Sequence, residues 1–381
     1  MELRILSLNF LFYSLSGFWR PVQWTSKLSK TLYGVFTFIS GYLTFYMFVT
    51  HFMYIIFVVE TLNDLASCCF HILAIVNLIS KELTVVTRRN RLINLIEMLQ
   101  EDPCKPCDKE ETDIQLKYDY MIRSYSMPYI IICSMSMMNC WIGGVLFMLE
   151  GQIPYGLAWV PWDCSSFFIF FLTSIQVMLG TFLAIFVNIA TETSILGFCL
   201  QICARFEILK YRLQKMINHN EWENISSFTN KTSRLAKHVS HHLYIIRLAE
   251  MINDIFDHVI FFQFSTSILI LCSTLYHLSL NSVLLDVLVL SAFTVCIFLQ
   301  IFFYCWGANE VMLKSVEFGK DIYDLNWILM TNSERKDLLI IMKRSAKPIK
   351  FSSSFLITLS LESYTNLMKA SFSAFNLMQQ L

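Results

Sequence analysis

The lysine and arginine residues of this chain follow a pattern that few folds can accommodate. Twenty-eight of the 29 fall into four clusters, and three stretches without any basic residue separate these clusters: Thr31–Ser80, Ser124–Ala204 and Leu248–Leu313. Each stretch is strongly apolar and long enough for two helices that cross a membrane, because one crossing takes about 20 apolar residues. The pattern therefore predicts three pairs of membrane-spanning helices.

The four basic clusters indicate how these helices are oriented. They cover Arg4–Lys30, Lys81–Arg123, Arg205–Arg247 and Lys314–Lys350, and we expect them in the cytosol because cytoplasmic loops collect Lys and Arg. The chain would begin in the cytosol, form three outward hairpins and leave through a seventh helix, which carries the remaining basic residue, Lys369. A cytosolic N-terminus and an extracellular C-terminus are the reverse of a G-protein-coupled receptor, so that class is excluded.

The composition agrees with a compact helical membrane domain. Apolar residues make up 55% of the chain and charged residues 15%, with a formal net charge of zero, whereas a soluble domain carries about 25% charged residues. Met1–Lys30 holds Arg20 and Pro21 and lacks a small-residue cleavage site, so the first membrane helix is expected to act as the insertion signal. We predict an all-α membrane protein.

The helices and their turns divide the chain into four parts. We expect a cytosolic N-terminus over residues 1–30, six membrane helices with their loops over 31–314, a cytosolic amphipathic anchor segment over 315–350 and the seventh helix over 351–381. The fourth, fifth and sixth helices are predicted to continue past the membrane into the cytosol. The amphipathic segment would either bind a partner or pack against these inward ends.

Several polar residues can be assigned an environment from this topology. Lys81, near the end of the second helix, is expected to extend its ammonium to the cytosolic surface. Glu192, inside the fourth helix, is expected to face protein and not lipid. The acidic run Asp108–Asp113 is predicted to be a solvated loop, and the adjacent His241 and His242 are predicted to lie on the cytosolic surface.

The seventh helix differs from the other six because it carries a polar stripe. Such a stripe suits a helix that lines a water-filled pore, and hydrogen bonding between packed helices explains it equally well. Its polar residues recur every three or four positions, which places them on one helix face: Thr358, Glu362, Thr365, Lys369, Ser373, Asn376 and Gln380.

The sequence carries no constellation that points to catalysis or to a cofactor. It has no glycine-rich phosphate loop and no pair of histidines at metal-binding spacing on a membrane helix. Cys104 and Cys107 form a CxxC motif without a second one to complete a zinc site, and most other cysteines fall inside helices, where they are expected to act as small apolar residues. We therefore predict neither an enzyme nor a metal-binding or nucleic-acid-binding protein.

The predicted outer loop Ile153–Asp163 reads IPYGLAWVPWD. It looks like the Leu-Pro-Phe…Trp-Tyr-Pro-Trp-Asp loop of the insect odorant receptors, which this chain resembles along nearly its whole length. The resemblance continues through the fifth, sixth and seventh helices, at His241–Phe256, Gln263, Phe264, Ser267, Cys272, Tyr304–Gly307, Ser315, Tyr323, Trp327, Pro348 and Ser371–Met378.

The resemblance implies an odorant-gated, non-selective cation channel that needs no G protein. Family members are tetramers in the plasma membrane of olfactory sensory neurons, where a tuning subunit that binds small volatile odorants pairs with a shared co-receptor. The second cytoplasmic loop, about Gln214–Val239, is short here, so this chain resembles a tuning subunit. Gustatory receptors share the architecture and stay open as an alternative. A transporter is a weaker one because we find no internal repeats.

The resemblance also implies roles for residues of the seventh helix. Leu377 falls where the family has an apolar gate, and Gln380 where a polar residue follows it. Lys369, Ser373 and Asn376 share the predicted pore stripe. Two residues depart from the family pattern: Lys369 puts a positive charge on the pore stripe, which opposes cation passage, and Asn376 stands where the family usually has an apolar residue or Thr. Both departures argue against a good cation channel built from this chain alone.

We expect the odorant to bind in a closed, mostly apolar pocket in the outer half of the membrane. The second, third, fourth and sixth helices would surround it. Helical spacing predicts that ten residues face this pocket, although each could equally be an ordinary core residue: Phe70, Leu73, Asn77, Met138, Trp141, Val145, Ile175, Met178, Leu290 and Phe293. Aromatic and methionine side chains offer contact area with few directional demands, so the ligand should be small and apolar.

Overall fold

The computed structural model describes residues 6–21, 23–60, 62–154, 159–222, 228–280, 284–325, 330–353 and 357–380. These residues are almost entirely helical. The helices are α1 (Ser7–Leu15), α2 (Lys27–Phe57), α3 (Leu62–Thr87), α4 (Arg89–Gln100), α5 (Lys109–Leu149), α6 (Phe167–Trp222), α7 (Phe228–Leu280), α8 (Leu284–Tyr323), α9 (Asn332–Ser345) and α10 (Leu361–Gln380). Two short strands, β1 (Ser352–Ser353) and β2 (Ile357–Thr358), pair antiparallel just before α10.

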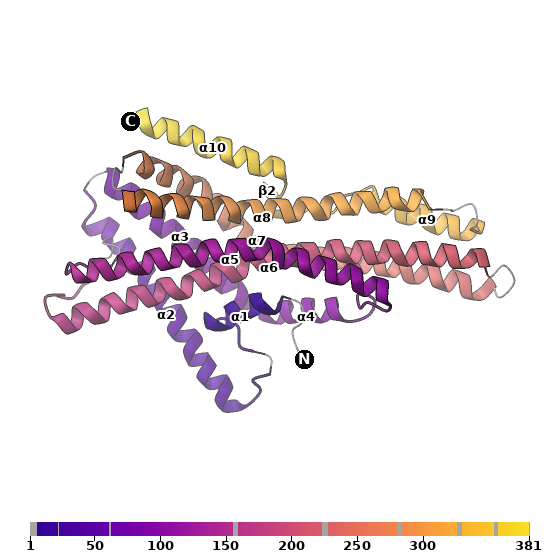
Figure 1. The fold of residues 1–381 in the computed structure, drawn as a ribbon, viewed down its shortest axis with the longest axis horizontal. Helices are drawn as coiled ribbons and strands as arrows, with labels where there is room; N and C mark the ends of the chain where they lie inside the picture. The colour runs from indigo at the N-terminus through magenta and orange to yellow at the C-terminus, as the bar shows by residue number, and fades with distance from the viewer. Residues whose placement is uncertain are drawn as a thin grey trace.

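Four long helices run side by side along the molecule (Figure 1). α5, α6, α7 and α8 contain 41, 56, 53 and 40 residues. At about 1.5 Å per residue they are roughly 60–84 Å long, about two to three times the apolar thickness of a membrane. These helices are therefore longer than one membrane crossing requires, and their extension into the cytosol stays a prediction. Most of the predicted loop Gln214–Val239 belongs to the end of α6 and the start of α7. Residues 223–227, between the two helices, lie outside the described residues.

Within the described residues, six helices are long and apolar enough to cross a membrane. They are α2, α5 and parts of α3, α6, α7 and α8, which matches the six predicted before the last helix. α10 does not meet this criterion. It starts at Leu361 and not near Ser352, because Ser352–Ser353 and Ile357–Thr358 pair as the strands β1 and β2. Thr358 therefore lies on a strand and is not part of the helical stripe, and that part of the prediction is wrong.

α6 is the central helix of the bundle. All residues from Ile189 to Phe206 are buried, as expected for a helix that other elements surround on every face. Part of this cover comes from α1, which the sequence did not reveal. Tyr13 Oη donates to Thr191 Oγ1 at 3.0 Å, and Asn9 Nδ2 donates to Thr193 Oγ1 at 2.8 Å. The N-terminal segment is thus part of the packed core.

The loop between α4 and α5 also packs against α6, contrary to prediction. Asp108 caps the first turn of α5 by accepting from the backbone N–H of Glu111 at 2.9 Å. Glu111 is itself buried and lies 2.7 Å from Arg212 in an ion pair. Since caps and carboxylates stabilise a helix N-terminus, the acidic run starts a helix and is not a solvated loop. His241 and His242 are likewise buried, with 2% and 3% of their surface exposed.

The amphipathic segment after α8 forms α9, which packs against α7 and α8 through one face. Leu338 and Ile341 are buried there, whereas Leu339 and Ile340 remain 61% and 63% exposed. A capping box formed by Thr331 and Glu334 fixes the start of the helix. Packing within the chain therefore accounts for one apolar face of α9, and a second apolar strip stays uncovered.

Candidate functional site

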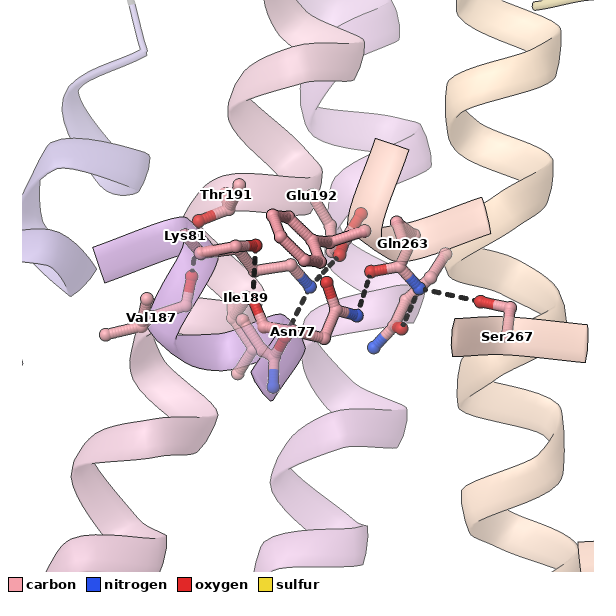
Figure 2. Close-up of polar contacts among 12 residues, drawn as sticks. Asn77, Lys81, Val187, Ile189, Thr191, Glu192, Gln263 and Ser267 are labelled. Carbon is pink, nitrogen blue, oxygen red and sulfur yellow. Dashed lines mark hydrogen bonds and ion pairs between the residues drawn. The ribbon is translucent and has the colours of Figure 1, made fainter. Parts of the chain in front are cut away.

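A buried ion pair joins α3 to α6 in the centre of the bundle (Figure 2). Lys81 Nζ lies 2.6 Å from Glu192 Oε1 and 2.6 Å from Asn188 Oδ1. The side chains of Lys81 and Glu192 are both 0% exposed. Lys81 therefore does not extend to the surface as predicted, because a carboxylate within reach in a low-dielectric interior is a stronger partner. The prediction that Glu192 faces protein is confirmed.

One turn before Lys81, Asn77 starts a second set of buried polar contacts. Its amide Nδ2 donates to Gln263 Oε1 at 2.5 Å. Gln263 Nε2 donates to Gln300 Oε1 at 3.0 Å and to Ser267 Oγ at 3.2 Å, and Gln300 Nε2 donates to Tyr129 Oη at 3.2 Å. The chain of hydrogen bonds thus crosses from α3 through α7 and α8 to α5, and Figure 2 shows its first members. Asn77 Oδ1 is buried without a hydrogen-bond partner.

Apolar and aromatic contacts continue from this polar set along the same helices. Phe70 of α3 meets Phe293 of α8 edge to face, with ring centroids 4.7 Å apart. Leu73 of α3 and Phe293 are partly buried against the core. Trp141 of α5 meets Phe182 of α6, with ring centroids 5.8 Å apart. Trp141 is 38% exposed, whereas Met178 of α6 is 5% exposed.

Besides Trp141, which is 38% exposed, three of the predicted pocket residues do not face the interior of the bundle. Met138, Val145 and Ile175 are 61%, 45% and 42% exposed. The first two share an exposed helical stripe of α5 with Ile131 and Ile142, and Ile175 shares one on α6 with Leu172. The inward orientation predicted for these three residues is wrong. α5 carries apolar residues on several faces, so helical spacing alone does not tell its inner side from its outer side.

The face of α10 turned away from the bundle is mostly polar, although it also carries Phe372, which is 58% exposed. Leu367 and Ser371 are 5% and 1% exposed and pack inward, while Lys369, Ser373 and Asn376 on the opposite side are exposed. Figure 1 shows α10 along the edge of the molecule, beside α8. The predicted stripe thus forms one uncovered face within the described part of α10. The side chains of Leu377 and Gln380 lie outside the described residues.

Comparison with known proteins identifies the family. A family model described as the 7tm odorant receptors matches residues 61–372. The chain belongs to the insect odorant receptor family. Putative odorant receptor 85d of Drosophila melanogaster is 24% identical over 257 residues, which are 67% of this chain and 59% of that one. Odorant receptor 10 of Aedes albopictus is 28% identical over 160 residues, 42% of this chain and 43% of that one. The matches thus span less than two thirds of these relatives.

Solved structures share the whole fold of this odorant receptor. The olfactory receptor OR5 from Machilis hrabei in complex with eugenol superposes with a TM-score of 0.84 at 15% identity, over 98% of this chain and 97% of that one. A second structure of the same Machilis hrabei receptor superposes with a TM-score of 0.85 at 14% identity and the same coverage. The chain is therefore a multi-span membrane protein of the odorant receptor family, with the fold of the Machilis hrabei receptor.

The buried polar contacts of this odorant receptor were only partly foreseeable. Asn77 was predicted to line a pocket, and Gln263 belongs to the residues that resemble the family. Gln300 and Tyr129, which complete the chain of hydrogen bonds, were missed. Gln300 stands in an otherwise apolar segment, and this could have indicated the contact. Polar side chains inside a membrane form hydrogen bonds with neighbouring helices. Trp327 and residues 155–158 lie outside the described residues.

Proposed function

We propose that this receptor is a tuning subunit of an odorant-gated, non-selective cation channel in the plasma membrane of olfactory sensory neurons. The observation that carries the proposal is the uncovered polar face of α10, with Lys369, Ser373 and Asn376 exposed. A polar face on a helix of a membrane protein needs water or a polar partner. Four subunits that turn this face toward a common axis would give it a water-filled pore, with α10 as a seventh membrane-spanning helix.

The proposed topology places the N-terminus in the cytosol and the C-terminus outside. The four basic clusters support it, since all of them would then lie on the cytosolic side. An epitope tag at Met1 should bind antibody only after the cells are permeabilised, whereas a tag after Leu381 should bind it on intact cells. Antibody binding to the N-terminal tag on intact cells would contradict the topology.

The ligand we propose is a small volatile odorant held between α3, α5, α6 and α8. Phe70, Phe293 and Trp141 offer aromatic surface there, and the unpartnered Asn77 Oδ1 offers one acceptor for a hydrogen bond. Few polar groups among apolar ones are typical of small-molecule sites. The Machilis hrabei receptor, which shares this fold, has a structure in complex with eugenol. This supports a small ligand for the present receptor.

The partner we propose is the odorant receptor co-receptor. In a homotetramer, four copies of Lys369 would face one pore and repel cations, and fewer copies per channel relieve this repulsion. The exposed strip of α9, with Leu339 and Ile340 61% and 63% exposed, supports a subunit contact next to the described bundle.

Current recordings in a heterologous cell test the function. The receptor should give odorant-evoked cation current when it is expressed with the co-receptor, and little or none alone. Lys369→Ala should raise the current of the receptor expressed alone, whereas Lys117→Ala, an exposed lysine of α5, serves as the control. Robust current from the receptor alone that Lys369→Ala leaves unchanged would show that this face does not line the pore.

A further inference from the structure

Two cysteines from different helices meet inside the bundle. Cys133 of α5 and Cys296 of α8 place their sulfur atoms 4.0 Å apart. Both are free thiols, and their residues are 7% and 6% exposed. The usual role of a buried cysteine is that of a small apolar residue. A pair of thiols in direct contact across two helices has a further chemistry open to it.

The pair occupies a defined level in the α5–α8 contact. One turn before Cys133, Tyr129 accepts a hydrogen bond from Gln300 at 3.2 Å, and Gln300 lies one turn after Cys296. Tyr129 also meets Phe303 at a centroid distance of 5.3 Å. The two antiparallel helices thus stay in register from the thiols to the polar chain that ends in Asn77, so movement of α5 along α8 is restricted on that side.

The other side of the pair leads to the aromatic residues of the proposed ligand site. Phe293 lies one turn before Cys296 on α8 and contacts Phe70. Trp141 lies two turns after Cys133 on α5 and contacts Phe182. Along α5 and α8 the thiols therefore lie between the aromatic residues proposed to contact odorant and the contact of Gln300 with Tyr129.

We propose that Cys133 and Cys296 form an oxidisable dithiol, and that a peroxide converts it into a disulfide that ties α5 to α8 and restrains the odorant response. The cross-link requires the sulfur atoms to approach from 4.0 Å to about 2.05 Å, a closure that side-chain rotation and a small shift of the helices can supply. In the reaction each sulfur loses one electron, an S–S bond forms and the O–O bond of hydrogen peroxide breaks. Both thiol protons end in the two water molecules produced.

The effect on the odorant response rests on the proposed function, whereas the cross-link does not. A disulfide at this level fixes two of the helices that would have to adjust around a ligand. Because coupling between two sites commonly changes affinity by about five-fold or more, the odorant concentration for half-maximal current should rise by about that factor after oxidation. Reduction with dithiothreitol should reverse the change.

A cleavage assay on the full chain tests the cross-link. A protease site inserted between Trp222 and Phe228 places Cys133 and Cys296 on different fragments. After hydrogen peroxide treatment of membranes and cleavage, the wild-type fragments should stay joined on a non-reducing gel and separate with dithiothreitol. Cys133→Ser and Cys296→Ser should each give separate fragments, and the control Cys140→Ser should stay joined.

Peptide mass analysis of the oxidised wild-type receptor gives a second measurement that needs no variant. It should find the Cys133 peptide linked to the Cys296 peptide. Wild-type fragments that separate, or a link that survives in Cys133→Ser or Cys296→Ser, would overturn the dithiol. A complete link with an unchanged odorant dose–response would overturn the restraint. Absence of current in every reduced receptor would instead contradict the channel function, while the gel still decides the link.

Discussion

The ion pair between Lys81 and Glu192 provides a quantitative test of how the bundle is held together. Both side chains are 0% exposed and 2.6 Å apart. Lys81→Met keeps the length of the side chain and removes the charge, which leaves Glu192 buried without its cation. Breaking one partner of such a pair costs about 3–5 kcal/mol.

Asn188, which also contacts Lys81 at 2.6 Å, loses a hydrogen bond in the same variant. We therefore expect Lys81→Met to destabilise the receptor by about 3–5 kcal/mol.

Thermal unfolding of detergent-solubilised receptor, followed by size-exclusion chromatography, measures the effect. Lys81→Met should lower Tm by several degrees, and Lys117→Met, at an exposed position, should change it little, since surface substitutions usually stay within about 0.5 kcal/mol. The double variant Lys81→Met with Glu192→Leu should recover part of the loss, because an apolar pair of similar volume can replace a buried ion pair. Equal Tm values for Lys81→Met and Lys117→Met would refute the reasoning.

Three further predictions concern the site and the surface. Phe293→Ala and Trp141→Ala should shift the odorant dose–response; if neither does, the placement of the ligand is wrong. Leu377→Ala should raise basal leak with the co-receptor, since an apolar ring can block ions by dewetting, and an unchanged leak would argue against a gate there. Maleimide at pH 7.5 should label the exposed Cys107 and not Cys104, because burial raises the pKa of the Cys104 thiol to about 11. The reactive thiolate of Cys104 becomes abundant only as the pH approaches that value. Equal labelling of the two cysteines would contradict the burial of Cys104.

Sequence reasoning found the membrane helices because the distribution of charge along a chain reports directly on the bilayer. It could not find contacts that depend on which helices are neighbours. Lys81 is the clearest case, since its position near a helix end suggested the surface, and only the approach of α6 supplies Glu192. The same limit explains Met138, whose side chain points outward because α5 has few packed neighbours on that side.

α1 and the acidic run show a second limit. The acidic run was expected to be a solvated loop, and no packing was predicted for residues 1–30, yet Glu111 and Tyr13 are buried against α6. The length of α6 decides this, since a helix that continues past the membrane offers a surface against which nearby segments pack. The polar stripe of α10 was predicted correctly over Glu362–Asn376, because spacing along one helix needs no knowledge of its neighbours.

The uninterrupted length of α6, α7 and α8 links distant parts of the receptor. These helices contain no proline within their bounds, so they lack the commonest cause of a kink, whereas α5 carries Pro128. A rod about 84 Å long that tilts by about 3° about one end moves its other end by about 4 Å. Any ligand that tilts α6 must therefore also do work at its far end. By reciprocity, a partner that holds that far end changes the affinity for the ligand by the same factor.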